Sequence, residues 1–471
     1  MRQLNDITIV ASSEGGTLTH SDNERMGTDS IPKLIRQIGA PMILSLLCNS
    51  LYNVVDSVFV SHIQEDALTA LSLAAPVQNV MSAIGCGLAV GLNAVISRAL
   101  GEGNPKKVSA AARASTFLAV CAWGIIVLLC LLLAKPYFLW QAGGDGAIYR
   151  YGVVYLRIVM LFSLWQMGQW VFDRFLIATG KSLHFLITLG VASLVNLTLD
   201  PILIFGYFGL PRMETAGAAI ATVIGQFCGA AAGIAVNRKW NPAIPILFRG
   251  RVDKRSSLEI LRIGIPTFIM QSVVSLSGIL MNTILQAFSY TAVAVMGICN
   301  RLSGLATIPI NGINCGLIPL IAYNYGAKNR DRIYESIRVS FRYDFILMGI
   351  VWLLLTLFAK PILILFDASA AMFAIGIPAV RILACSYFFS TLGLVYSTVF
   401  QALGRGDYSM WLTLCRQVFF PLTLALFFSR MGMLTLVWAS FVLAELLASP
   451  IALTFMRRIN RLVLQERKQM V

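Results

Sequence analysis

Charged side chains are scarce in this chain. Of its 471 residues, 13% are charged and 57% are hydrophobic, and the mean hydropathy is +0.76. A soluble protein needs a far more polar surface in order to be solvated. The composition therefore excludes a soluble globular protein and indicates one that lies in a lipid bilayer.

Histidine is scarcer still, and the chain has only three, His20, His62 and His184. The sequence contains neither a zincin motif nor a recognisable pair of serine with lysine or histidine. Its nine cysteines lack CxxC spacing and lie mostly in apolar runs, which is typical of small apolar side chains. We therefore do not expect an enzyme, and we expect no catalytic residue, no metal site and no cofactor.

An apolar signal-peptide core is missing from residues 1–30, which are mostly polar. We expect this segment to be a disordered cytoplasmic tail. The first apolar run then serves as the signal for membrane insertion.

Long apolar runs are what the chain has in abundance. About twelve of them reach the roughly 20 residues that an α-helix needs to cross a bilayer. Their expected spans are 34–60, 67–99, 108–139, 149–178, 183–206, 215–236, 258–287, 291–323, 333–364, 372–402, 409–429 and 432–456. We predict an all-α integral membrane protein with twelve transmembrane helices.

The chain repeats itself at an offset of about 225 residues, far longer than the period of a solenoid. Ile38-Gly39-Ala40-Pro41 returns as Ile263-Gly264-Ile265-Pro266, and Gly101-Glu102-Gly103-Asn104 returns as Gly326-Ala327-Lys328-Asn329. Each half holds an even number of helices, so both halves enter and leave the membrane on the same side. We predict two six-helix bundles, 31–236 and 258–456, related by a pseudo-twofold axis along the membrane normal.

Basic residues are distributed unevenly between the two sides. If the N-terminus lies inside, the outward loops hold only Lys135, Arg150, Arg212, Lys360 and Arg430. This positive-inside pattern predicts that both termini are cytoplasmic. It also accounts for the net charge of +15, so we expect no nucleic-acid partner. The basic segments 237–257 and 457–471 are expected to form a cytoplasmic linker and a cytoplasmic tail.

Few carboxyl groups lie deep in the apolar runs, where a charge costs several kcal/mol unless it is paired or protonated. In the first run Asn49, Asn53 and Asp56 share one helical face, and in the fifth run Asn196 and Asp200 do the same. A carboxyl group that is charged in one state and neutral in another carries a proton. We predict this role for the two acids. The alternative, left open above all for the asparagines, is that these groups hold helices together.

Five short motifs stand out along the chain. They are Ile38-Gly39-Ala40-Pro41, Asn53-Val54-Val55-Asp56-Ser57-Val58-Phe59-Val60, Gly101-Glu102-Gly103-Asn104, Asn196-Leu197-Thr198-Leu199-Asp200-Pro201 and Gln401-Ala402-Leu403-Gly404-Arg405-Gly406. Together they resemble the multidrug and toxic compound extrusion (MATE) family over residues 31–458. The loop 101–107 lacks the pattern of the major facilitator family. The resemblance implies a cation-coupled exporter of organic, often cationic and amphipathic compounds, as in its bacterial members of the inner (plasma) membrane. We expect a monomer.

The resemblance also implies a cation site in the N-terminal half. In the members that this chain resembles most, acids of the first and fifth helices form it with an asparagine and a tyrosine. The matching positions here are Asp56, Asp200, Asn196 and Tyr155, and Thr222 is an expected neighbour. Sodium-linked members also carry acids in helices 7 and 10, which this chain lacks. Proton coupling is therefore favoured, and sodium remains an alternative.

The residues that contact the substrate are the least clearly indicated by the sequence. The expected polar contacts are Asn49, Asn53, Gln271, Arg301 and Gln401. If Arg301 faced the transport path it would repel cations and indicate an anionic or zwitterionic cargo. Two other charges in apolar runs, Arg416 and Glu445, are expected to form a buried pair, because an unpaired charge there would be costly.

Pro41 and Pro266 occupy equivalent places in the first and seventh helices, where they would act as hinges or as fixed kinks. The sequence as a whole predicts an antiporter that exports hydrophobic cationic compounds by alternating access as protons enter. The alternatives are a sodium-coupled exporter and a flippase for a lipid-linked saccharide. A flippase requires a strongly cationic transport path. Arg301 and Arg416 are too few cations to form one.

Overall fold

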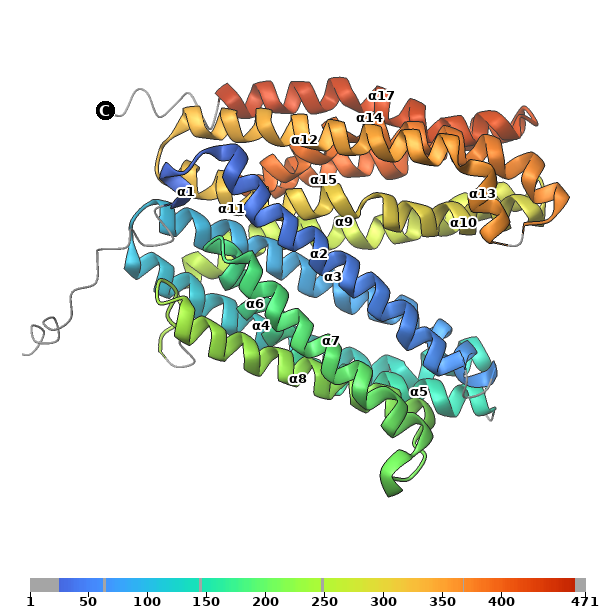
Figure 1. The fold of residues 1–471 in the computed structure, drawn as a ribbon, viewed down its shortest axis with the longest axis horizontal. Coiled ribbons are helices and arrows are strands. Elements are labelled where there is room, and N and C mark those ends of the chain that lie inside the picture. Colours follow the sequence, from blue (N-terminus) through green and yellow to red (C-terminus); the bar gives the residue numbers. More distant parts are fainter. Residues whose placement is uncertain (1–24, 62–64, 144–145, 247–249, 367, 462–471) are drawn as a thin grey trace, which may run out of the picture.

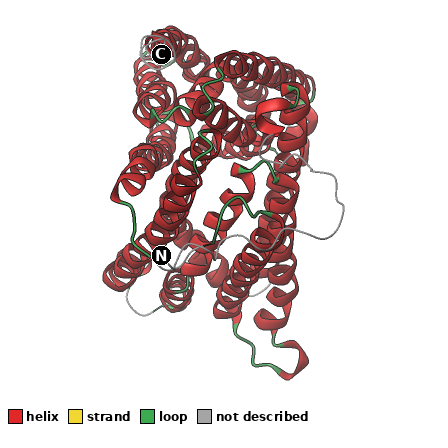
Figure 2. Ribbon diagram, turned by 90° about the vertical axis from the view of Figure 1, so that its left-hand side faces the viewer, coloured by secondary structure: helices red, strands yellow, loops and turns green. Residues whose placement is uncertain are grey.

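The computed structural model describes residues 25–61, 65–143, 146–246, 250–366 and 368–461, without the side chains of 53, 54, 56–58, 60, 61 and 65. Within these ranges every regular element is a helix (Figures 1 and 2). In chain order they are α1 (Arg25–Thr28), α2 (Ile31–Ser61), α3 (Glu65–Gly101), α4 (Pro105–Ala142), α5 (Ala147–Leu161), α6 (Leu164–Ala178), α7 (Ser182–Phe205), η1 (Tyr207–Gly209), α8 (Glu214–Trp240), α9 (Lys254–Gln286), α10 (Tyr290–Ala306), α11 (Ile308–Gly326), α12 (Arg330–Leu357), α13 (Ala359–Leu365), α14 (Ala370–Ala402), α15 (Gly406–Leu414), η2 (Cys415–Phe419), α16 (Phe420–Arg430) and α17 (Leu434–Ile459).

The part of the chain that the structure describes offers up to twelve membrane spans. Ten helices are long and apolar enough to cross a bilayer, and two bent pairs of helices are each long and apolar enough for one further span. The predicted twelve-helix, all-α fold is thus confirmed.

Two of the expected runs are not single helices. The run expected at 149–178 is split into α5 and α6, which meet at 46°, and the run expected at 291–323 is split into α10 and α11, which meet at 43°. At the second break Pro309 lies in the first turn of α11, where its missing N–H group costs nothing. The continuous helices expected at these two places are therefore corrected to bent pairs.

The helices form two bundles, called here the N-lobe (α2 to α8) and the C-lobe (α9 to α17). Figure 1 shows the C-lobe above and the N-lobe below, and the two approach each other at the end that carries α1 and the end of α17. We call this the terminal end and the opposite one the distal end. Toward the distal end the two lobes diverge (Figure 1).

The two lobes contact each other where α3 meets α9 and where α2 meets α11, and we call these contacts the seam. Glycines allow the helices to approach closely there. A Cβ atom on Gly87 of α3 would clash with the carbonyl oxygen of Gly264 of α9, and one on Gly316 of α11 would press on Ile38 of α2. Helix α3 thus packs on α9 as α11 packs on α2. Because Gly39 and Gly264 are equivalent in the two repeats and both lie at this seam, the repeated Ile-Gly-x-Pro sequence marks the contact between the lobes.

The second repeated motif forms the turn that follows α3 in one lobe and α11 in the other. Asn104 caps α4 by accepting a hydrogen bond from the backbone N–H of Lys107 at 3.1 Å, and Asn329 caps α12 by accepting one from Arg332 at 3.3 Å. The residues before these caps, Gly103 (φ 61°) and Lys328 (φ 59°), are both left-handed. The matching geometry shows that the halves repeat in structure as well as in sequence.

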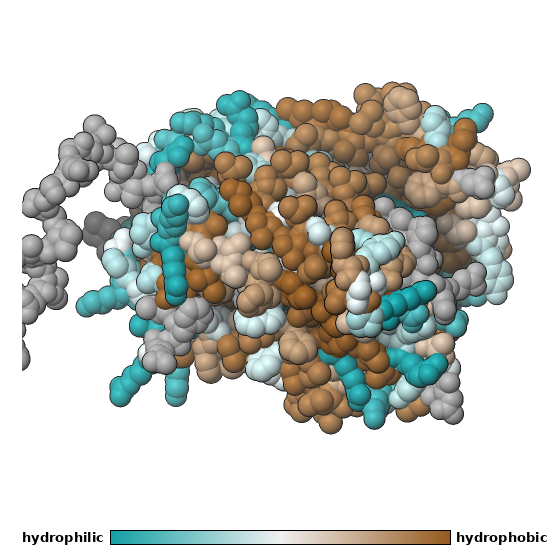
Figure 3. Space-filling view, turned by 60° about the horizontal axis from the view of Figure 1, so that its bottom comes forward, coloured by the Kyte–Doolittle hydropathy of each residue, from teal (hydrophilic) through white to brown (hydrophobic). Residues whose placement is uncertain are grey.

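The surface of the molecule carries an apolar band. In Figure 3 hydrophobic residues cover the middle of the visible face, and hydrophilic ones gather toward its two ends. Leucines on α4 that would be costly in water, such as Leu131 and Leu132, are each 60% exposed. This is the surface of a protein whose middle is covered by lipid.

Three expected segment boundaries shift because helices and their contacts extend into them. Residues 25–30, expected in the disordered tail, begin with α1, and Arg332 donates hydrogen bonds to the carbonyl oxygens of Met26 and Asp29 at 3.1 and 2.6 Å. The expected linker 237–257 shortens to 241–253, since α8 runs to Trp240 and α9 begins at Lys254. Likewise α17 runs to Ile459, inside the expected tail 457–471. Residues 1–24 and 462–471 lie outside the described ranges.

Candidate functional site

Two polar side chains share the inner face of α7. Asn196 and Asp200 are one turn apart, and their exposed fractions are 3% and 0%. Pro201 follows within the same helix and removes one backbone donor beside the carboxyl group. The predicted placement of this acid and amide in the interior of the N-lobe agrees with the structure.

Helix α8 adds a hydroxyl group to this face. The side-chain amide of Asn196 donates a hydrogen bond to Oγ1 of Thr222 at 3.3 Å, and that hydroxyl donates to the carbonyl oxygen of Ala218 at 2.9 Å. Gly225 makes the approach possible, because a Cβ atom there would lie 2.9 Å from Cβ of Asn196. The structure therefore brings Thr222 into contact with Asn196.

A tyrosine hydroxyl from α5 is also buried in the N-lobe. Tyr155 is 6% exposed, and its hydroxyl accepts a hydrogen bond from the amide of Gln78 on α3 at 3.1 Å. Sequence reasoning missed Gln78, although an amide in the apolar run 67–99 was a visible signal. The pair ties the hydroxyl of Tyr155 to α3.

The predicted partner acid on α2 can be placed only by its backbone. The side chains of Asn53 and Asp56 lie outside the part of the chain that the structure describes. Helix α2 packs against α7, and Asp56 lies five residues before the end of α2 at Ser61, as Asp200 lies five before the end of α7 at Phe205. The two positions therefore have similar depths in neighbouring helices.

The residues expected to contact substrate are dispersed. Asn49 is exposed on α2 and Arg301 is exposed on α10. Gln271 of α9 reaches across the seam and donates its amide to Sγ of Cys86 on α3 at 3.9 Å. Gln401 is buried near the terminal end of α14 and donates to Oγ of Ser409 at 3.0 Å. The described contacts do not gather these residues at one site, and their substrate role stays a prediction.

The expected pair of buried charges is formed in the C-lobe. Arg416 donates two hydrogen bonds to Glu445, from Nε at 2.7 Å and from Nη2 at 2.9 Å. Arg416 lies in the π-helical turn η2, and Gly393 leaves the space that its guanidinium group fills. The pair joins η2 to α17 inside the lobe.

The two prolines expected to act as hinges lie inside unbroken helices. Helix α2 runs through Pro41 and α9 runs through Pro266. Each proline follows the seam glycine of its lobe by two residues, and the hydroxyl of Ser45 donates to the carbonyl oxygen of Pro41 at 2.7 Å. Their role as hinges stays a prediction.

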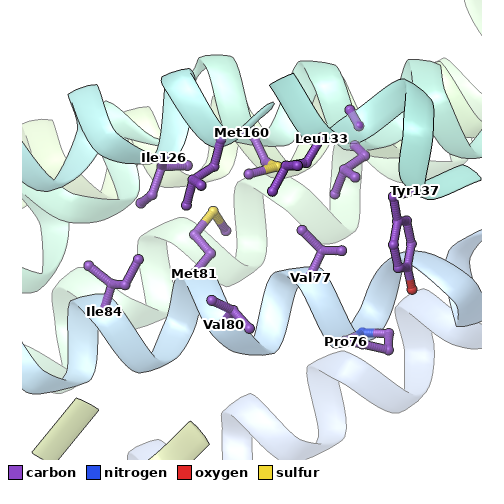
Figure 4. Close-up of a pocket in the computed structure, with 12 residues that line it drawn as sticks. Pro76, Val77, Val80, Met81, Ile84, Ile126, Leu133, Tyr137 and Met160 are labelled. Atoms are coloured by element: carbon purple, nitrogen blue, oxygen red, sulfur yellow. The ribbon is translucent and has the colours of Figure 1, made fainter. Parts of the chain in front are cut away.

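The N-lobe also contains an apolar cavity of about 280 Å³ between α3, α4 and α5 (Figure 4). Met81, Val77 and Ile84 of α3 face Ile126 and Leu133 of α4 across it, as Figure 4 shows. The hydroxyl group of Tyr137, which also lines it, donates to the carbonyl oxygen of Leu73 at 2.7 Å. Such a cavity suits hydrocarbon groups and offers little to a charged ligand.

Sequence reasoning missed two further buried acids. Asp173 of α6 is 3% exposed and accepts a hydrogen bond from Oγ1 of Thr188 at 2.7 Å. Asp344 of α12 is fully buried. Asp173 is followed by Arg174, and Asp344 lies two residues after Arg342. The local sequence at each place is therefore typical of a polar surface. Only the packing shows that the carboxyl groups point inward.

A family model named MatE matches residues 41–202 and 266–427, one segment in each lobe. The FAD transporter of Shewanella oneidensis is 24% identical over 422 residues, which cover 85% of this chain and 89% of that protein. The multidrug export protein MepA of Staphylococcus aureus is 24% identical over 419 residues, covering 88% and 91%.

Among solved structures, one titled as the outward-facing conformation of a multidrug resistance MATE family transporter has a TM-score of 0.86 and 23% identity. It covers 94% of this chain and 98% of its own. The two lobes, the paired spans and the two matched segments therefore agree. This chain belongs to the multidrug and toxic compound extrusion (MATE) family of multidrug efflux transporters.

Proposed function

We propose that this protein is an antiporter that exports amphipathic organic cations as protons enter. The observation that carries the proposal is the burial of Asp200, which is 0% exposed and lies one turn from the buried Asn196 in a membrane-spanning helix. Asparagine alone would hold helices together without the cost of burying a charge. A carboxyl group in that place is explained by a need to bind and release a proton.

The arrangement of the lobes supports transport by alternating access. Glycine contacts hold α3 to α9 and α2 to α11, and the lobes diverge toward the distal end (Figure 1). Alternating access requires a conformation in which the lobes are held together at one end, as they are here at the terminal end. The other conformation requires the seam to separate and the distal ends to approach.

Protons are favoured over sodium as the coupling ion because few oxygen ligands gather in the described site. Sodium, as a hard cation, needs several oxygen ligands. Among the described residues Asp200 and Asn196 supply carboxylate and amide oxygens, and the hydroxyl of Thr222 is already hydrogen-bonded. A proton needs only one carboxyl oxygen.

An anionic cargo is the second candidate, because one relative is named an FAD transporter and FAD carries a pyrophosphate group. One cation that could meet such a cargo is Arg301, which is exposed on α10. The same charge would serve the phosphate of a lipid-linked saccharide, as the flippase alternative requires.

The test is transport by the purified protein in liposomes. A pH gradient and a sodium gradient are imposed separately, and movement of ethidium, FAD and a polyprenyl-linked sugar is followed in parallel. Ethidium movement driven by the pH gradient, with none driven by sodium, supports the proposal. Movement of only FAD or the lipid-linked sugar would replace the cationic cargo, and movement driven only by sodium would replace the proton.

A further inference from the structure

Asp344 lies in the middle of the C-lobe, away from the site described above. It is the fifteenth of the 28 residues of α12, about 21 Å along the helix from Arg330 at 1.5 Å per residue. Its side chain is 0% exposed. Neither carboxyl oxygen has a hydrogen-bond partner among the described residues.

The face of α12 that carries Asp344 is a row of small polar residues. Ser336, Ser340 and Asp344 recur every four residues, and all three are fully buried. The hydroxyl of Ser336 donates to the carbonyl oxygen of Arg332 at 2.6 Å, whereas that of Ser340 has no partner among the described residues. A carboxyl and a hydroxyl group thus lie one turn apart with unused hydrogen-bonding capacity.

No cation compensates a charge on Asp344 in the described structure. Helix α12 packs against α2, α11, α13 and α14, whose charged residues are Lys33, Arg36, Asp56, Lys360 and Arg381. Lys33 pairs with Asp29 at 3.2 Å, Arg36 donates to the carbonyl oxygen of Pro32 at 3.3 Å, and Arg381 donates to that of Thr356 at 3.3 Å. Lys360 is exposed, as are Arg338 and Arg342 of α12 itself. The side chain of Asp56 is not described. The other titratable groups on these helices are cysteines and tyrosines, which are neutral at ordinary pH.

Comparison of the halves shows that the N-lobe lacks a counterpart of Asp344. The repeated positions that flank it, Gly101 with Gly326 and Pro136 with Pro361, are offset by 225 residues, which places Asp344 opposite Ala119. This alanine is buried. The core of the N-lobe therefore accepts a small apolar residue where the C-lobe has a carboxyl group, so the repeated fold does not require an acid at this place.

We propose that Asp344 is a second proton-binding site, one that lies in the C-lobe and loads and unloads during the transport cycle. In the conformation described here the carboxyl group is fully buried and has no hydrogen-bond partner among the described residues, a setting that is costly for an ionised carboxylate. It therefore holds its proton on an O–H bond. It passes the proton to water when α12 moves and water reaches Ser340 and Asp344.

Only the role of Asp344 in coupling rests on the proposed function, because proton binding by Asp344 can be measured without transport. The reconstituted protein is titrated while infrared difference spectra record the carbonyl stretch of protonated carboxyl groups. Asp344→Asn, Asp344→Glu and the control Ser336→Ala are compared with the native chain. The control removes a buried hydroxyl from the same face without changing any titratable group.

We expect Asp344→Asn to lose one protonated-carboxyl band that Ser336→Ala retains and Asp344→Glu shifts. We also expect the ratio of protons entering to dye leaving to fall by about half in Asp344→Asn, because one of two carboxyl groups no longer exchanges a proton. If Asp344→Asn does not fold, an unshifted band in Asp344→Glu overturns the proposal, as does an unchanged spectrum of a folded Asp344→Asn. If Asp344→Asn loses the band and transport by the native chain does not depend on the pH gradient, the proton-binding site is supported and the proposed function is refuted.

Discussion

Gly101 of α3 lies against the carbonyl oxygen of Tyr323 of α11, so closely that a Cβ atom on the glycine would overlap that oxygen. Gly326, the equivalent of Gly101 in the second half, lies in the same way against the carbonyl oxygen of Arg98, the equivalent of Tyr323. The terminal ends of the lobes are thus closed by a symmetrical pair of contacts that only glycine permits.

Replacement of either glycine should open the terminal end. In Gly101→Ala or Gly326→Ala the added methyl group meets backbone, at a typical cost of about 1–3 kcal/mol, which corresponds to a shift of about one to two powers of ten in the population of the closed seam. Spin labels on α4 and α9, at positions 107 and 255 in a cysteine-free background, measure the separation of the lobes. Gly124→Ala is the control, since a Cβ atom there meets nothing within 4 Å. Label distances unchanged from the native chain in both seam variants would refute the closing role of these glycines.

Removing one partner of the Arg416–Glu445 pair should destabilise the fold strongly, whereas replacing both partners by apolar residues should destabilise it much less. In Glu445→Gln the guanidinium group keeps its burial and loses its counter-charge, which costs about 3–5 kcal/mol. The double variant Arg416→Met with Glu445→Leu should recover most of that loss, because no buried charge remains. Thermal unfolding in detergent measures both. Equal losses in the single and double variants would contradict this account of the pair.

Glu102 should make the turn after α3 sensitive to acid. Burial raises the pKa of its carboxyl group, but the ammonium group of Lys107 at 2.6 Å and the guanidinium group of Arg98 at 3.2 Å together hold the pKa below its usual range. Arg98 also lies over the ring of Tyr325 of the C-lobe, 5.0 Å from its centre. A lowered pKa in the folded state means that the stabilisation is present above the unfolded value and is lost as the pH falls through the folded one.

Glu102→Gln should therefore lower the unfolding free energy at pH 7 by at most about 1 kcal/mol, because the cluster is partly solvated. The difference from the native chain should disappear once the pH falls below the lowered pKa of Glu102 in the folded state, where the native carboxyl group is protonated. Unfolding curves at several pH values test this. A difference that stayed constant down to the lowest pH at which the native chain folds would show that the side chain stabilises the turn by packing and not by charge.

The repeated fold could be predicted from the sequence because its constraints are local. The glycine at each seam contact and the asparagine at each cap must recur in each half, so they leave matching short motifs. The bend between α5 and α6 could not be predicted, since it is set by packing between helices. The bend before α11 had one local sign, Pro309, but a proline also occurs in unbroken helices such as α2 and α9.

The candidate site could be predicted only where one helix carries it. The four-residue spacing of Asn196 and Asp200 places them on one face of α7 whatever surrounds that helix. The contact of Asn196 with Thr222 depends on how α8 approaches α7, which no short segment encodes. Ser336, Ser340 and Asp344 also share one face of a helix, but whether that face is buried depends on how α12 is rotated in the bundle, and this became visible only in three dimensions.

The coupling role of Asp200 is tested most directly by the rate at which a pH gradient drives ethidium out of liposomes that contain Asp200→Asn. The matched control is Thr198→Ala, which alters the exposed side of the same helix. We predict that Asp200→Asn folds, still binds ethidium and loses at least about tenfold of the pH-driven rate, while Thr198→Ala transports at the native rate. A folded Asp200→Asn that moves ethidium at the native rate and with the native dependence on the pH gradient would contradict the claim.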